Sequence, residues 1–252
     1  IANRAFEQIE KMDSIFSNYR ADSELSRINE QKTAIYISKD FFNLVSIANT
    51  FQSQYSGKLD PSIGKAIDYW KGIFISKSKP DWKMLKKWVK KRRKVRIRET
   101  KKGYLLKKSA FVQLDMGALA KGYAVDKAAE ILEASGLTIY LIDGGGDLRI
   151  GKAPPGAKGW RIQLDNLQSN EILTLENCAV ATSGDIYQYL VIDGVRYSHI
   201  IDPKTLHPLK DQHTATVVAN NCVSADALST IYSFPFDESS IKEPKAYQLI
   251  LR

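Results

Sequence analysis

Cysteine and histidine are scarce in this sequence, which has two cysteines and three histidines among 252 residues. The two cysteines, Cys178 and Cys222, cannot build a disulfide framework, and their positions lack the spacing of metal ligands. We therefore expect both to be small apolar residues within strands. The sequence also lacks a GxSxG segment and a Cys–His arrangement, so it gives no sign of a covalent nucleophile supplied by the chain itself.

Long apolar runs, internal repeats and low-complexity linkers are absent as well. No segment reaches the roughly 20 consecutive apolar residues that a membrane-spanning helix needs. The sequence begins at Ile1, already in a helical pattern, without an initiating methionine or a signal peptide. We therefore expect that it was shortened by processing or by design. Because no linker divides the sequence, we expect residues 1–252 to form a single domain.

Positive charge is what the sequence has in excess, with a formal net charge of +9 and an otherwise ordinary globular composition. A basic balance favours acidic partners such as phosphates, nucleotides, nucleic acids or anionic membranes. The densest basic stretch is KKWVKKRRKVRIR at residues 86–98, and a solvent-exposed helix face is its ordinary explanation. Nucleic-acid binding is the alternative, but we expect Trp82 and Trp88 to pack against the protein rather than to stack on bases.

The hydrophobic pattern mixes helical and strand periods. Predicted helices cover residues 1–16, 40–57, a segment around Ile67 and Trp70, and residues 78–94, 118–136 and 224–234, with Asp40 as the cap of the second. Predicted strands are KVRIRE, GYLLKK, AFVQLD, TIYLID, WRIQL, EILTL, CAVATS, IYQYLVI and TATVVA. We expect an α+β fold of largely antiparallel sheets flanked by helices, with two lobes and a site between them as an open alternative.

The segment LDMGALAKGYAVDKAAEIL, residues 114–132, contains a lysine at the start of a predicted helix. A helix N-terminus carries partial positive charge and attracts anions, so Lys121 is mildly unfavourable there unless an anion binds. Asp115 could cap the helix, and Gly117 and Gly122 allow close approach of another group to the backbone. A capped helix with a solvated lysine is the alternative.

Two other stretches place oxygen or nitrogen ligands together. In SADALSTIYSF, Asp226 and Thr230 share one helical face, and such an oxygen pair suits Mg²⁺, although a helix cap is the ordinary alternative. In YSHIIDP, His199 near Asp202 could act as a general base, with a structural hydrogen bond as the alternative.

Several turn segments have no decisive pattern of their own. His207 and His213 have no partner spacing, and GGGDL at 144–148 lacks the dinucleotide-binding fingerprint and is expected to be a tight turn. Asp60 and Ser62 could cap the helix that follows them or hold polar groups of a nucleotide.

Taken in order, these stretches resemble the ApbE family, the FAD:protein FMN transferases. The matching stretches are SNYRADSELSRIN, LDPSIGKAIDYW, LDMGALAKGYAVDKAAEIL, LIDGGGDL, AVATSGD, SHIIDPKT and SADALST, which run from about Tyr19 to Thr230. Each stretch is weak alone, and their joint order is highly specific.

The resemblance implies an enzyme that binds FAD and Mg²⁺, cleaves the diphosphate and moves FMN onto a threonine of an acceptor flavoprotein, releasing AMP. The implied acceptor is a membrane redox subunit, the implied setting is extracytoplasmic, often as an exported lipoprotein, and no nucleic acid is expected. An FAD pyrophosphatase giving FMN and AMP and a non-catalytic flavin-binding protein are the alternatives.

The resemblance also assigns roles to residues. The implied flavin-nucleotide contacts are Tyr19, Leu59, Asp60, Asp115, Lys121 and Ile201. The implied metal ligands are the backbone carbonyl of Ala118 and the side chains of Asp226 and Thr230. The histidine of SHIIDP, His199, is implied to be needed for activity, and we expect His199 or Asp202 to be the base that accepts the threonine proton.

Three departures from the family pattern accompany this resemblance. Leu206 follows Thr205 where the family has a glycine, and a leucine would be strained if that position requires a positive φ. Ser229 offers only a hydroxyl where some members have a second acidic residue. The family's N-terminal flavin-contacting segment is expected to be missing, because the sequence starts too late to include it.

Overall fold

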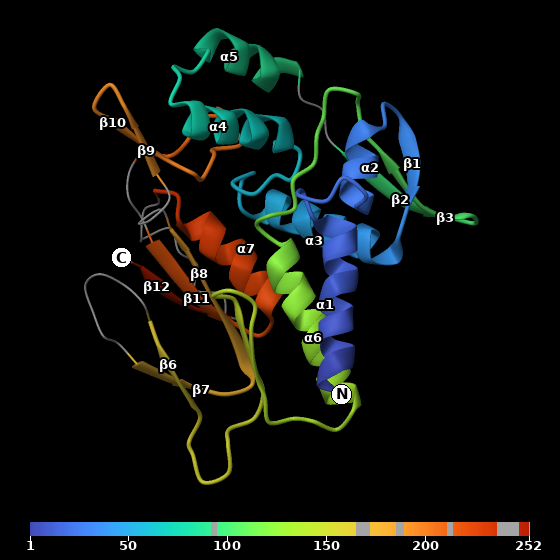
Figure 1. The fold of residues 1–252 in the computed structure, drawn as a ribbon, viewed down its shortest axis with the longest axis vertical. Coiled ribbons are helices and arrows are strands. Elements are labelled where there is room, and N and C mark those ends of the chain that lie inside the picture. The colour runs from blue at the N-terminus through green and yellow to red at the C-terminus, as the bar shows by residue number, and fades with distance from the viewer. Residues whose placement is uncertain (92–94, 165–171, 185–188, 211–213, 236–246, 252) are drawn as a thin grey trace.

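The computed structural model describes residues 1–91, 95–164, 172–184, 189–210 and 214–235 and the backbone of 247–251. Within these ranges the fold is mixed α+β (Figure 1). The helices are α1 (Ala2–Phe16), α2 (Glu24–Glu30), α3 (Lys39–Gln54), α4 (Gly64–Ser76), α5 (Trp82–Lys91), α6 (Ala120–Ala134) and α7 (Cys222–Tyr232). Asp185 of AVATSGD, the residues Arg92 and Arg93 of the basic stretch, and His213 lie outside the described residues.

The strands are short and pair antiparallel, as the sequence predicts. They are β1 (Ala34–Ile37), β2 (Arg96–Thr100), β3 (Gly103–Lys107), β4 (Leu141–Asp143), β5 (Leu148–Ile150), β6 (Trp160–Gln163), β7 (Ile172–Leu175), β8 (Cys178–Gly184), β9 (Tyr189–Ile192), β10 (Val195–Ser198), β11 (Thr214–Ala219) and β12 (Tyr247–Leu251). The largest sheet has the order β12-β11-β8-β5-β4, and the smaller ones are β1-β3-β2, β6-β7 and β9-β10.

Three helices, α7, α6 and α1, pack one after another on this five-stranded sheet. Helix α7 packs on β8 and β11, α6 packs against α7, and α1 covers α6, so the layers follow one another across Figure 1. Both faces of α7 are therefore covered, which explains why it is buried along nearly its whole length, including the polar residues Asp226 and Ser229. Strand β11, TATVVA, is likewise buried at every position, because both of its faces are covered.

The starts of α6 and α7 lie against each other. A Cβ placed on Gly122 of α6 would lie 2.5 Å from the carbonyl oxygen of Cys222, so only glycine allows this approach. One turn further along α6, the carboxylate of Asp126 accepts hydrogen bonds from the N–H groups of Cys222 and Val223 at 2.8 and 2.9 Å. These donors belong to the first turn of α7 and have no partner within that helix, so α6 caps α7.

A second apolar cluster joins α4, α5, the β9–β10 hairpin and the loop that follows it, at the top of Figure 1. Its largest buried side chains include Trp70 and Leu85, and Leu206 of the following loop packs with them. Trp82 lies with its ring 5.8 Å from that of Trp70 and 4.7 Å from that of His207. Trp82 therefore packs against neighbouring rings as predicted, with 40% of its surface exposed.

Some local predictions were wrong. The side chain of Ser38, rather than Asp40, caps α3 by accepting a hydrogen bond from Phe41 N, while Asp40 pairs with Lys11 at 3.1 Å. The stretch AFVQLD forms no strand among the described residues and contributes only an isolated bridge between Gln113 and Ile63. Both cysteines are free. Cys178 lies in strand β8 as predicted, whereas Cys222 is the first residue of helix α7, so its predicted place in a strand is wrong. No helix in the described ranges has both the length and the apolar character to cross a membrane.

Candidate functional site

The loop before α6 is held by Asp115, but not in the way the sequence suggested. Its Oδ1 accepts a hydrogen bond from Gly117 N at 2.7 Å, and its Oδ2 accepts one from Asn18 Nδ2 at 2.7 Å. Helix α6 begins only at Ala120, and its N-cap, Leu119, makes no side-chain capping bond. The prediction that Asp115 caps α6 is therefore wrong, because a further turn of chain separates them. Burial raises the pKa of the Asp115 carboxyl, and the Gly117 N–H partly offsets this.

The positive charge of Lys121 is compensated from the glycine-rich turn. Its Nζ lies 3.2 Å from Oδ1 of Asp147 and donates a hydrogen bond to the carbonyl oxygen of Gly145 at 3.2 Å. The turn itself requires glycine, since Gly145 and Gly146 have φ values of +76° and +94°. GGGDL is therefore a tight turn, as predicted, and the contact of its aspartate with Lys121 of α6 is one that no local pattern in the sequence indicates.

Asp147 and Asp226 form a buried carboxyl pair under Lys121. Their residues are 2% and 7% exposed, and they contact two adjacent residues of α6, Asp147 through Nζ of Lys121 and Asp226 through the N–H of Gly122. Gly122 N donates a hydrogen bond to Oδ2 of Asp226 at 3.1 Å. Burial raises the pKa of both carboxyl groups, that of Asp226 well above its usual range, and the nearby Asp147 raises the pKa of Asp226 further. Such a pair is stabilised by a shared proton or by a bound cation.

The residues at this point fit a divalent cation. Oδ2 of Asp147 is buried without a hydrogen-bond donor, which is the kind of oxygen that a cation satisfies. Thr230 lies one turn beyond Asp226 on α7 and is half-buried, and Ala118 lies in the loop before α6. The described residues contain no group of three or more His, Cys, Asp or Glu arranged to hold a metal. Two carboxylates, a hydroxyl and a backbone carbonyl, completed by phosphate or water, are the donors that Mg²⁺ prefers.

Ser229 does not replace the acidic residue that some family members have. Its Oγ donates a hydrogen bond to the backbone carbonyl of Asp226 at 2.8 Å, within α7, and the residue is 1% exposed. Its hydroxyl therefore serves the helix backbone.

The segment from Leu59 to Ser62 lies beside the Asp115 loop. Pro61 O accepts a hydrogen bond from Asp115 N at 2.8 Å, and Oδ1 of Asp60 accepts one from Ser62 N at 2.8 Å. The predicted capping of α4 by Asp60 or Ser62 is wrong, because the N-cap is Ile63 and it makes no side-chain bond. Asp60 instead closes a turn of its own, while Leu59 is buried in the core.

Tyr19 is the most exposed of the predicted contacts, at 90%. It follows Asn18, which bonds Asp115, and Nζ of Lys71 lies 5.5 Å from the centre of its ring. Tyr19, the segment containing Asp60 and the loop containing Asp115 are thus brought together from three distant parts of the chain.

The loop after β10 separates the roles of His199 and Asp202. His199 is exposed. Both carboxylate oxygens of Asp202 accept hydrogen bonds within its own turn, Oδ1 from Lys204 N at 2.8 Å and Oδ2 from Thr205 Oγ1 at 2.9 Å. Asp202 therefore shapes the turn. Ile201 is buried and bridges to Pro208, so its side chain is part of the core and only its backbone is available to a ligand.

Leu206 occupies the left-handed conformation that the family glycine would adopt easily. Its φ is +61°, its side chain is 3% exposed, and its carbonyl oxygen accepts a hydrogen bond from Nε1 of Trp70 at 2.9 Å. The left-handed conformation costs a non-glycine residue about 1–2 kcal/mol, whereas removing a buried leucine side chain costs about 2–5 kcal/mol. The burial of the side chain therefore outweighs the backbone strain.

We expect both Leu206→Gly and Leu206→Ala to be destabilised, and the alanine variant to be at least as unstable as the glycine variant. Alanine loses the buried side chain and keeps the strain, whereas glycine loses slightly more side chain and relieves the strain. Urea denaturation of the two variants measures this order. A glycine variant clearly less stable than the alanine variant would contradict the assigned conformation.

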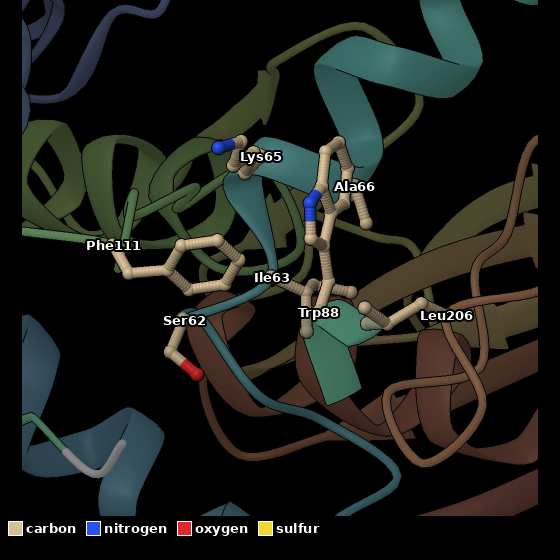
Figure 2. Close-up of a pocket in the computed structure, with 7 residues that line it drawn as sticks. All are labelled: Ser62, Ile63, Lys65, Ala66, Trp88, Phe111 and Leu206. Atoms are coloured by element: carbon tan, nitrogen blue, oxygen red, sulfur yellow. The ribbon is translucent and has the colours of Figure 1, made fainter. Parts of the chain in front are cut away.

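A small pocket opens beside Ser62, at the edge of the second apolar cluster (Figure 2). It is lined by Ser62, Ile63, Lys65, Ala66, Trp88, Phe111 and Leu206. Nζ of Lys65 lies 4.8 Å from the centre of the Trp88 ring and 4.6 Å from that of Phe111, a cation–π arrangement. Trp88 thus packs against the protein as predicted, and the exposed lysines of α5 lie on the solvent side of the same helix.

Comparison with known proteins matches this arrangement to a family. The model of the ApbE family matches residues 1–240. This chain belongs to the ApbE family. Among its relatives, the FAD:protein FMN transferase of Vibrio cholerae is 31% identical over an alignment of 252 positions that covers 96% of this chain and 75% of that protein. The FAD:protein FMN transferase of Chlamydia muridarum is 31% identical over 237 residues, covering 91% of this chain and 74% of that protein.

Solved structures of ApbE proteins have the same fold. The crystal structure of the ApbE protein of Thermotoga maritima superposes with a TM-score of 0.80 at 28% identity, over 91% of this chain and 77% of that one. The flavin transferase ApbE of Vibrio cholerae gives a TM-score of 0.79 at 26% identity, over 99% of this chain and 87% of that one. The family resemblance and the α+β fold class expected from the sequence are therefore confirmed, while the roles of individual ApbE site residues stay predictions.

Proposed function

We propose that this protein transfers FMN from FAD to a threonine hydroxyl of an acceptor protein, depends on Mg²⁺ and releases AMP. The observation that supports this best is the buried Asp147–Asp226 pair below Lys121, with one carboxylate oxygen that lacks a donor. A site of this kind suits a divalent cation and a diphosphate together. The FAD:protein FMN transferases of the same family support the choice of substrate.

The transfer requires one bond to form and one to break. The threonine oxygen bonds to the phosphorus of the FMN half of FAD, the bond from this phosphorus to the bridging oxygen breaks, and AMP leaves with that oxygen. Asp226, Thr230 and the carbonyl of Ala118 would hold Mg²⁺, which when bound neutralises charge on the diphosphate. The ammonium of Lys121 adds positive charge at the start of α6, where the helix also favours an anion. Positioning and charge neutralisation account for most of the rate enhancement in phosphoryl transfer.

His199 is the better of the two candidate bases, because both oxygens of Asp202 are already engaged in the turn. A base that accepts the proton of a threonine hydroxyl contributes about 10²–10⁴-fold to a rate. We expect His199→Ala to lower FMN transfer within this range while FAD binding is retained. If His199→Ala transfers FMN at the wild-type rate across neutral pH, His199 is not the base.

The acceptor assay tests the function as a whole. The protein is incubated with FAD, Mg²⁺ and an acceptor domain, in parallel with an acceptor whose target threonine is replaced by valine and with added EDTA. The expected result is an acceptor whose mass increases by one FMN group, together with free AMP, and neither product in the two controls. Free FMN and AMP without an adduct would indicate an FAD pyrophosphatase, and intact FAD would indicate a flavin-binding protein without turnover.

The acceptor and the compartment are proposed from the family resemblance. We propose an extracytoplasmic setting and, as the acceptor, a membrane redox subunit with an exposed threonine. The exposed lysines of α5 give this chain a basic surface that suits an acidic protein partner.

A further inference from the structure

We propose that Asp147 supplies a second carboxylate to the divalent cation site, beside Asp226. Asp147 lies on the turn between β4 and β5, faces the starts of α6 and α7, and is 2% exposed. It pairs with Lys121 through Oδ1, while Asp226 accepts from the N–H of the adjacent Gly122, and Oδ2 of Asp147 has no hydrogen-bond donor. The inference rests on the proposed function, because it assumes that a divalent cation binds here.

The glycine-rich turn does not need the Asp147 side chain. The hydrogen bond that closes the turn through a side chain comes from Asp143, whose Oδ1 accepts from Gly146 N at 2.8 Å. Asp147 contributes to the turn only through its backbone, where its carbonyl accepts from Gly144 N at 2.9 Å. Any residue could make that backbone bond, so the turn gives no reason for a carboxylate at position 147.

The ion pair with Lys121 does not explain the burial of Asp147 either. The side chain of Lys121 is 46% exposed, and ion pairs with exposed partners contribute little to stability. A carboxylate that is 3% exposed is costly unless its oxygens are satisfied, and Lys121 satisfies only Oδ1. The Asp226 carboxyl that faces the pair offers no donor unless it is protonated. A bound cation satisfies the remaining oxygens of both carboxyl groups at once.

The test measures Mn²⁺ binding to the metal-free protein by titration calorimetry, without FAD. Asp147→Asn keeps the shape of the side chain and removes its charge. Asp143→Asn is the matched control, since it removes one charge from the exposed side of the same turn and keeps the acceptor for Gly146. We expect Asp147→Asn to weaken Mn²⁺ binding by about 10–100-fold, the usual effect of losing a side chain at a metal site. We expect Asp143→Asn to bind Mn²⁺ with nearly the affinity of the wild type. Equal affinities of Asp147→Asn and the wild type would overturn the inference.

Thermal unfolding distinguishes a metal-site residue from a structural one. In the metal-free state Asp147→Asn removes a buried charge next to another carboxyl, so we expect its unfolding temperature to equal or exceed that of the wild type, with a smaller rise on adding Mn²⁺. A lower metal-free unfolding temperature with an undiminished rise would show that Asp147 is structural. Should Asp147→Asn fail to fold, Asp147→Ser removes the carboxylate with a smaller side chain, and the same criteria apply.

Failure of this inference and failure of the proposed function give different results. If the wild type binds Mn²⁺ and transfers FMN, but Asp147→Asn binds Mn²⁺ equally well, only the role of Asp147 is wrong. If the wild type binds no Mn²⁺ and transfers FMN in the presence of EDTA, the metal site is wrong and the transfer reaction stands. If it transfers no FMN to any acceptor but binds Mn²⁺ through Asp147, the reaction is wrong and the site stands.

Discussion

Replacing Asp226 with asparagine should reduce FMN transfer by about 10³-fold, corresponding to roughly 4 kcal/mol of transition-state stabilisation. Asparagine can still accept the hydrogen bond from Gly122 N, so the contact between α6 and α7 is retained while the charge that would bind the cation is lost. Single-turnover transfer from FAD to the acceptor, measured over a range of Mg²⁺ concentrations, gives both the rate and the metal requirement.

Ser229→Ala is the control for this substitution, because Ser229 is buried on the same helix and its hydroxyl donates to the backbone of α7. We expect its transfer rate to stay near that of the wild type. Asp226→Asn with a rate within tenfold of the wild type and an unchanged Mg²⁺ requirement would exclude Asp226 as a metal-binding residue.

The same substitution should change how the stability of the metal-free protein depends on pH. Burial raises the pKa of Asp226 in the folded state, so the folded protein binds more protons than the unfolded chain above the ordinary aspartate pKa. The free energy of unfolding of the wild type must therefore fall as the pH rises from that value through the raised pKa. Asp226→Asn removes this contribution, and we expect a flatter profile when urea denaturation is repeated over this pH range.

Gly122→Ala should lower the free energy of unfolding by about 3 kcal/mol, near the upper end of the usual cost of overpacking. The added Cβ would lie 2.5 Å from the carbonyl oxygen of Cys222 and 2.8 Å from Cα of Val223, both backbone atoms that cannot rotate away. The helices would have to separate, which also lengthens the hydrogen bond from Gly122 N to Asp226. For a domain of this size the expected fall in unfolding temperature is about 6–12 °C.

Gly72→Ala provides the matched control for Gly122→Ala. Gly72 lies inside α4 and is exposed, and a Cβ added to it would have no atom of the described residues within 4 Å outside its own stretch of helix. Because alanine is favoured over glycine in a helix interior, we expect this variant to be stabilised by up to about 1 kcal/mol. Calorimetric scans of the two variants measure the contrast, and similar unfolding temperatures would contradict the close crossing of α6 and α7.

The sequence was informative where a pattern is local. The periods of α1 and α6 are clear because the buried residues of each helix recur at helical spacing, and strands such as β8 and β11 could be recognised as short apolar runs. Helix caps were harder to predict. Ser38 and Asp40 lie two residues apart and both are residue types that cap helices, but Asp40 pairs with Lys11 of another helix and Ser38 makes the cap. The stretch AFVQLD has strand composition, but among the described residues no neighbouring strand pairs with it beyond one bridge.

The site was predictable only in part for a related reason. Lys121 and Asp226 stand out through local motifs and the family resemblance. Asp147 follows three glycines in an unremarkable turn, and its importance depends on contacts with α6 and α7, which are distant in sequence. The sequence shows that Leu206 replaces the family glycine, but it does not show whether the backbone there has a positive φ. The structure shows that it does.

The contact at Gly122 has a consequence for how the molecule would respond to its substrate. Since α7 packs directly on β8 and β11, a ligand that tightens the junction of the two helices also restrains the central strands. Amide hydrogens of those strands should then exchange more slowly with solvent deuterium when the site is filled.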